Sequence, residues 1–236
     1  MRRKRVILSA GGTGGHLFPA QALAQTLSEE CDILFVAGGL ATSPYFNTAH
    51  YPFEEIACGT FSFSNPLEVM RKGGKIIKGM GQGFSILRRF SPDVIVGFGS
   101  FYTLPVLLAA LIRKVPIVLH EQNAIPGKVN RLFSRFAHTT AITFPESAYY
   151  LKGNKVEVTF PLSKRKEVSA WDYFALTPGK PTLLIFGGSQ GAYQLNALFL
   201  ESVDKIVFPV QILHFTGKHG SVDEAKKRYK TLGIPH

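Results

Sequence analysis

The chain has 236 residues, of which 45% are hydrophobic and 18% charged, a composition typical of a globular protein. Its 27 basic residues outnumber 16 acidic ones, so the net charge is +11 and the partner should be anionic: nucleic acid, an acidic membrane surface or a phosphate-rich substrate. Two cysteines without metal-type spacing argue against a zinc site or a disulfide framework. The start Met1–Arg5 is basic, but the apolar run behind it is too short for a signal peptide, so we expect a soluble, cytoplasmic protein.

Short apolar strands alternate with helical segments as far as residue 145. Continuous Val, Ile and Leu strands separated by helices are typical of a parallel sheet covered on both faces. Ligands of such sheets bind at the carboxyl ends of the strands, so we expect the site in the loops after Ser9, Gly97 and His120. The expected strands are 5–9, 33–37, 53–57, 94–97, 117–120 and 139–142, and the expected helices are 17–28, 67–89, 102–112 and 126–136.

The alternation of strands and helices stops over residues 151–170, which we interpret as a linker between two α/β domains. Beyond it we expect strands at 182–186 and 210–214 and helices at 192–202 and 222–232. Two or three strands cannot close a covered parallel sheet, so this second domain is expected to be incomplete. We therefore predict a Rossmann-like first domain over 1–160, and a linker with the start of a second α/β domain over 161–236.

The loop Gly11-Gly12-Thr13-Gly14-Gly15-His16 directly follows the first strand and opens a helix. Bare backbone N–H groups at a helix N-terminus favour phosphate. The loop lacks the Lys-Ser/Thr of a Walker A motif, and Leu17 stands where GxGxxG needs glycine, which disfavours a nucleotide triphosphatase or a dehydrogenase. A ligand-free turn is the alternative. His16 is the only side chain of the loop that moves a proton near neutral pH, so it is the candidate catalytic residue, the alternative being a plain helix-start residue.

Three further loops carry polar or glycine-rich signals. His120-Glu121-Gln122-Asn123 ends a strand and is suited to hydrogen-bonding a sugar; the alternative is that Asn123 or Asn130 merely caps the helix that Pro126 begins. The segment 97–102, with Gly99, is a weaker signal, for which a plain turn is at least as good. Gly187-Gly188-Ser189-Gln190-Gly191 is a second phosphate-type loop behind a second strand, so a ligand held between two lobes is expected.

Basic residues interleave with large apolar ones between residues 70 and 89. Such a face binds anionic membrane surfaces if it is exposed, although a helix with an apolar core side and a solvated basic side is an equal alternative. Nucleic acid is not expected, because no aromatic–basic platform is present. The expected membrane face comprises Lys72, Lys75, Ile76, Lys78, Arg113 and Lys114.

Three motifs in order carry a family likeness: residues 11–20, residues 120–123 with Pro126-Gly127, and residues 187–192 with Asn196. Together they resemble the MurG family, bacterial inverting glycosyltransferases of peptidoglycan synthesis. The resemblance implies a two-lobed GT-B fold and transfer of N-acetylglucosamine from UDP-N-acetylglucosamine to the 4-hydroxyl of lipid I (undecaprenyl-diphospho-N-acetylmuramoyl-pentapeptide), which gives lipid II. It also implies no cofactor, no obligatory metal and a peripheral location on the cytoplasmic face of the plasma membrane. A catalytically silent, membrane-docked acceptor-binding module is the alternative.

The resemblance also implies roles for individual residues. His16 would be the base or a ligand of the acceptor diphosphate. One departure lies at Ser163, where the family carries an arginine that Lys164 or Arg165 could replace. By position, the donor would be contacted by Thr13, Gly14, Gly15, Asn123, Ser189 and Gln190, and the loops for the acceptor and its diphosphate would contain Gly11, Gly12, Gly99, Glu121 and Gln122.

Overall fold

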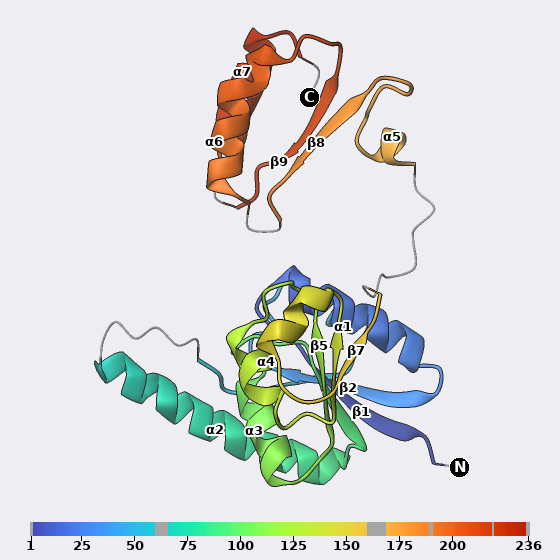
Figure 1. The fold of residues 1–236 in the computed structure, drawn as a ribbon, viewed down its shortest axis with the longest axis vertical. Coiled ribbons are helices and arrows are strands. Elements are labelled where there is room, and N and C mark those ends of the chain that lie inside the picture. The colour runs from blue at the N-terminus through green and yellow to red at the C-terminus, as the bar shows by residue number, and fades with distance from the viewer. Residues whose placement is uncertain (1, 60–65, 160–168, 189–190, 219, 235–236) are drawn as a thin grey trace. The chain divides into compact units, whose positions relative to one another are not determined.

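The computed structural model describes residues 2–59, 66–159, 169–188, 191–218 and 220–234, without the side chains of residues 66–70 and 72. The chain forms two compact units, residues 1–165 and 166–236 (Figure 1). The expected junction between residues 160 and 161 lies outside the described residues, as do Ser163, Lys164 and Arg165. Each unit is described by itself.

The first unit is a parallel α/β fold, as predicted. Its seven strands lie in the order β3-β2-β1-β4-β5-β6-β7, and every neighbouring pair is parallel. The strands are β1 (Lys4–Ser9), β2 (Cys31–Ala37), β3 (Phe53–Glu55), β4 (Val94–Gly97), β5 (Ile117–Glu121), β6 (Thr139–Ile142) and β7 (Lys155–Glu157). The helices are α1 (Gly14–Leu27), α2 (Pro66–Phe90), α3 (Leu104–Ile112) and α4 (Lys128–Phe133), with a 3-10 turn η1 (Pro145–Tyr150).

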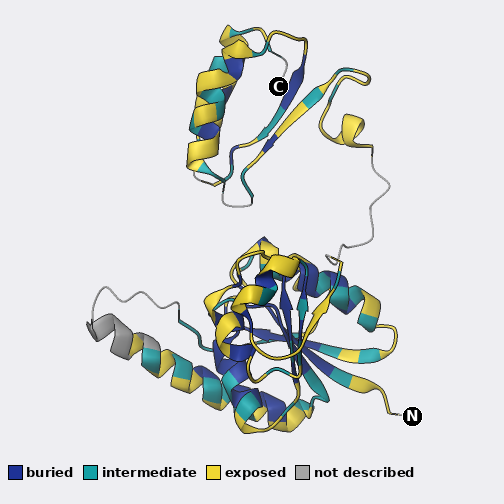
Figure 2. Cartoon of the chain, in the orientation of Figure 1, coloured by how far each residue is buried: buried dark blue, intermediate teal, exposed yellow. Residues whose placement is uncertain are grey.

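Both faces of this sheet are covered, because neighbouring residues of one strand belong to different cores. Ile7 of β1 packs with residues of α2, α3 and α4, whereas Leu8 packs with residues of α1 on the other face. Successive side chains of a strand point to opposite faces, so a strand that is apolar at every position is buried on both. Figure 2 shows the buried strands enclosed by helices whose outer faces are exposed.

Two expectations for this unit are wrong. The region 151–170, interpreted as linker, contains strand β7, whose three residues are all exposed and of which only Val156 is apolar. The helix expected from residue 126 to 136 begins at Lys128 and ends at Phe133. Its N-cap is Gly127 with no side-chain cap, so neither Asn123 nor Asn130 caps it.

The second unit is a smaller α/β fold with the expected strands and helices. Strands β8 (Thr182–Phe186) and β9 (Gln211–Phe215) are parallel. Ile185, Ile212 and Tyr229 lie in its core, while Leu184 and Phe186 of β8 are exposed. The remaining elements are α5 (Ala170–Tyr173), α6 (Tyr193–Ser202), η2 (Val203–Lys205) and α7 (Val222–Thr231).

Candidate functional site

The loops that follow β1 and β4 meet at the carboxyl edge of the first sheet. A Cβ atom at Gly11 would lie 2.7 Å from Cβ of Tyr102, and one at Gly12 would lie 3.1 Å from Oγ of Ser100. Gly12 also has a left-handed backbone, with φ +88°, as do Gly99 at +85° and Ser100 at +79°. The close approach of the two loops and the left-handed backbone at Gly12 therefore require these glycines. Tyr102 was not singled out from the sequence, since only the fold brings it to Gly11.

The N-terminus of α1 presents backbone donors at this edge. Thr13 is its N-cap in extended conformation, and the first intrahelical bonds run from N of His16 and of Leu17 to O of Thr13, at 3.2 and 3.1 Å. The backbone N–H groups of Gly14 and Gly15 come before the first intrahelical donor, so the helix itself offers them no acceptor. The first turn of a helix also carries partial positive charge. Thr13 and Gly15 are exposed, so this end of α1 can hold an anion.

His16 is held by the neighbouring loops rather than by its own helix. Its Nδ1 lies 2.8 Å from the carbonyl oxygen of Phe98 and 2.6 Å from Nε2 of Gln122. The Phe98 oxygen can only accept a hydrogen bond and the Gln122 amide nitrogen can only donate one, so the two contacts favour different tautomers of His16. In the tautomer that donates from Nδ1 to Phe98, the other ring nitrogen, Nε2, keeps the lone pair that a general base needs.

The surroundings keep His16 neutral at physiological pH. Burial lowers the pKa of His16 below its ordinary value, although the Phe98 hydrogen bond and the charge of Glu121 act in the opposite direction. A neutral imidazole is the form that accepts a proton. Nearby, His120 is buried, its Nδ1 lies 3.4 Å from Oε1 of Gln122, and burial lowers its pKa as well.

Glu121 organises the loop that follows β5. Its side chain is buried, with 1% of the residue exposed. Oε1 accepts hydrogen bonds from the backbone and side-chain nitrogens of Asn123, both at 3.0 Å. Oε2 accepts from the backbone nitrogen of Gly127 at 3.1 Å and from Nδ2 of Asn130 at 2.9 Å. Both carboxylate oxygens are thus used within the loop, and of the four polar residues 120–123 only Asn123 is exposed.

In the second unit, Ser189 and Gln190 lie outside the described residues, but their flanking glycines are described. Gly188 and Gly191 have φ values of +81° and +80°, which glycine adopts without strain. Asn196 of α6 donates to the carbonyl oxygen of Thr216 at 2.8 Å, and its Oδ1 lies 3.0 Å from Nε2 of His214. A Cβ atom at Gly191 would collide with that same carbonyl group, so the loops after β8 and β9 pack together.

The expected membrane face lies on α2 and just beyond α3. Lys75, Lys78, Arg113 and Lys114 are exposed, whereas the side chain of Lys72 lies outside the described part. Ile76 packs against the core, and the apolar residues exposed beside these basic residues are Ile77, at 70%, and Ile112, at 59%. No helix in the described ranges is long and apolar enough to cross a membrane. Nor does any cluster of three His, Cys, Asp or Glu among the described side chains suit a metal ion.

A covered parallel sheet with glycine loops and a histidine at its carboxyl edge, followed by a second α/β unit, is the arrangement of a GT-B glycosyltransferase. Solved glycosyltransferases share the fold. MurG of Acinetobacter baumannii matches with a TM-score of 0.71 and 27% identity, over 98% of this chain and 66% of that one. A glycosyltransferase from Rickettsia africae matches with a TM-score of 0.61 over 99% of this chain and 65% of that one, but at 10% identity it supports the fold alone.

The model of the glycosyltransferase family 28 N-terminal domain matches residues 6–142, and the chain belongs to this family. A relative from Protochlamydia amoebophila, 45% identical over 98% of this chain, is named UDP-N-acetylglucosamine--N-acetylmuramyl-(pentapeptide) pyrophosphoryl-undecaprenol N-acetylglucosamine transferase. A relative from Desulforamulus reducens with the same name is 35% identical over 98% of the chain. The chain spans 64% and 65% of the length of these two curated relatives.

Proposed function

We propose that this chain is the acceptor-binding part of an enzyme that transfers N-acetylglucosamine from UDP-N-acetylglucosamine to lipid I and so forms lipid II. The names of the relatives support this assignment and favour an enzyme over a silent binding module. In this proposal the first domain, 1–160, holds lipid I, and the segment 161–236 belongs to the domain that binds the donor. Ser189 and Gln190 would contact the donor diphosphate, with Thr13, Gly14, Gly15 and Asn123 reaching the donor from the first domain.

The observation that carries the chemistry is the 2.8 Å contact between His16 Nδ1 and the Phe98 carbonyl oxygen, because the tautomer that donates there leaves Nε2 as an acceptor. The acceptor 4-hydroxyl attacks the anomeric carbon of the donor and gives its proton to Nε2 of His16. As the new C–O bond forms, the bond from that carbon to the UDP oxygen breaks, and the electron pair leaves with UDP. Backbone N–H groups at the glycine loops offset the diphosphate charges.

Replacement of His16 by alanine tests this role in the product of the complete gene. His16→Ala should lower kcat by about 10²-fold or more with a modest change in the KM for lipid I. His138→Ala removes an exposed histidine and serves as the control. A large rise in KM with kcat intact would reassign His16 to binding of the acceptor diphosphate. A parent protein that binds both substrates without turnover would support the silent module.

We also propose that the protein binds the cytoplasmic face of the plasma membrane through Lys75, Lys78, Arg113, Lys114 and the exposed Ile77. Each basic residue near an anionic surface contributes about 1 kcal/mol, and salt weakens the attraction. The double variant Lys75→Glu/Lys78→Glu should lose co-sedimentation with phosphatidylglycerol vesicles at low salt. Its control, Lys226→Glu/Lys227→Glu, changes two exposed lysines of α7 and should still sediment. Equal sedimentation of both double variants would show that this face is not the membrane-binding surface.

A further inference from the structure

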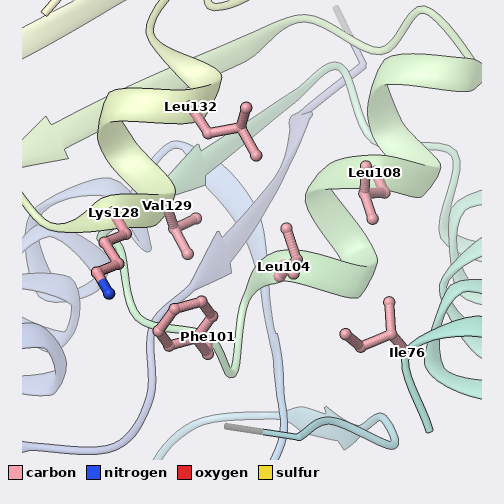
Figure 3. Close-up of a pocket in the computed structure, with 7 residues that line it drawn as sticks. All are labelled: Ile76, Phe101, Leu104, Leu108, Lys128, Val129 and Leu132. Atoms are coloured by element: carbon pink, nitrogen blue, oxygen red, sulfur yellow. The ribbon is translucent and has the colours of Figure 1, made fainter. Parts of the chain in front are cut away.

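An apolar pocket of about 410 Å³ lies among α2, α3 and α4 of the first unit. Figure 3 shows its apolar side chains around a common space, with Lys128 at one end. The volume falls in the range of roughly 300–1,000 Å³ that small-molecule sites occupy. With only one cationic side chain, this lining suits a hydrocarbon chain that carries an anionic group at one end. The lining residues are Ile76, Phe101, Leu104, Leu108, Lys128, Val129 and Leu132.

The pocket shares a loop with the candidate site. Phe101 lines the pocket, while the residues on either side of it, Ser100 and Tyr102, face Gly12 of the first glycine loop. Lys128 follows Gly127, whose backbone nitrogen donates to Glu121. The loop that borders the glycine-rich edge and the loop that Glu121 holds therefore both reach the pocket wall.

The opposite wall belongs to the basic face. Ile76 lines the pocket from α2, and its neighbours Lys75 and Lys78 are exposed. Leu132 of α4, 47% exposed, stands at the rim. The pocket is thus bounded by the candidate site on one side and by a basic helix on the other, which suits a lipid whose phosphates stay at the site while its chain continues toward the membrane.

We propose that this pocket binds the isoprenoid units nearest the diphosphate of a polyprenyl diphosphate, and that Lys128 pairs with the diphosphate. The inference rests on the proposed function, which places the diphosphate of the lipid acceptor at the first glycine loop. The pocket adds a subsite for the chain itself. Burial of each methylene group there removes apolar surface from water, so affinity should grow with the prenyl chain.

Titration calorimetry on this chain with farnesyl diphosphate and with inorganic diphosphate separates the chain contribution from that of the phosphates. Farnesyl diphosphate should bind at least about tenfold more tightly, since several methylene groups become buried. Leu132→Gln places a polar, uncharged amide at the rim and should abolish this advantage while the affinity for inorganic diphosphate stays the same. Leu198→Gln is the matched control, because Leu198 is a 63% exposed leucine of α6, and it should keep the advantage.

A second variant, Lys128→Gln, should weaken farnesyl diphosphate binding several-fold at low salt and less at high salt. Equal affinities of the parent for farnesyl and inorganic diphosphate would refute the role of the pocket as a prenyl-chain subsite, while the proposed function stands. Binding of neither probe would overturn both, because the acceptor diphosphate site would itself be missing. Equally tight binding of a straight-chain diphosphate of the same main-chain length, with the same dependence on Leu132, would replace the isoprenoid assignment by a general lipid-chain site.

Discussion

Glu121 offers the sharpest test of how the candidate site is held together. Its carboxylate accepts four hydrogen bonds, two from Asn123, one from Gly127 and one from Asn130. In Glu121→Gln only one side-chain oxygen remains, and the new amide group must face two of the donors. Two charge-assisted hydrogen bonds are lost, each with a net contribution of about 1.5–3 kcal/mol. Burial of a neutral amide costs less than burial of a carboxylate, so we expect a net destabilisation of about 2–4 kcal/mol.

Urea unfolding followed by far-UV circular dichroism measures this loss, and Glu146→Gln, at an exposed glutamate of η1, is the control. Because the two units can unfold separately, hydrogen exchange of residues 121–133 should be followed in parallel. Glu121→Gln should lower protection in that segment and leave β8 and β9 unchanged. A free energy of unfolding within about 0.5 kcal/mol of the parent would refute the view that the carboxylate organises the loop.

Two further predictions concern acid stability and the glycines. Burial lowers the pKa values of His16, His120 and His214, so the unfolded chain binds more protons than the folded one between these pKa values and about 6.5. Stability should therefore be fully present above pH ~6.5 and fall as the pH drops through the folded-state pKa values; equal urea midpoints at pH ~7.5 and ~5.5 would contradict this. Gly12→Ala should lower the thermal midpoint, because φ is +88° and Ser100 is close. Gly81→Ala, in α2 with open space around it, should instead stabilise the protein by up to about 1 kcal/mol. A lower thermal midpoint for both variants would refute this contrast.

The positions of most strands could be predicted because strands buried on both faces must be apolar at every residue. β1 shows this, since Ile7 and Leu8 belong to cores on opposite sides of the sheet. The exposed strand β7 could not be found, because its pairing with β6 depends on the sheet being there already. The start of α4 was also misplaced, because its N-cap, Gly127, has no capping side chain that the sequence could reveal. The backbone nitrogen of Gly127 is held instead by Glu121, which only the folded loop brings close.

The sequence by itself determined which loops border the site, because parallel strands bring their carboxyl ends to one edge and the glycines and His16 stand directly behind such strands. It did not determine what each polar side chain does there, since the hydrogen bond from His16 to Phe98 joins residues 82 positions apart. Nor did it reveal that Glu121 faces inward or that Tyr102 requires glycine at position 11. Those roles depend on which side chains become neighbours when the loops pack, and only the tertiary structure decides that.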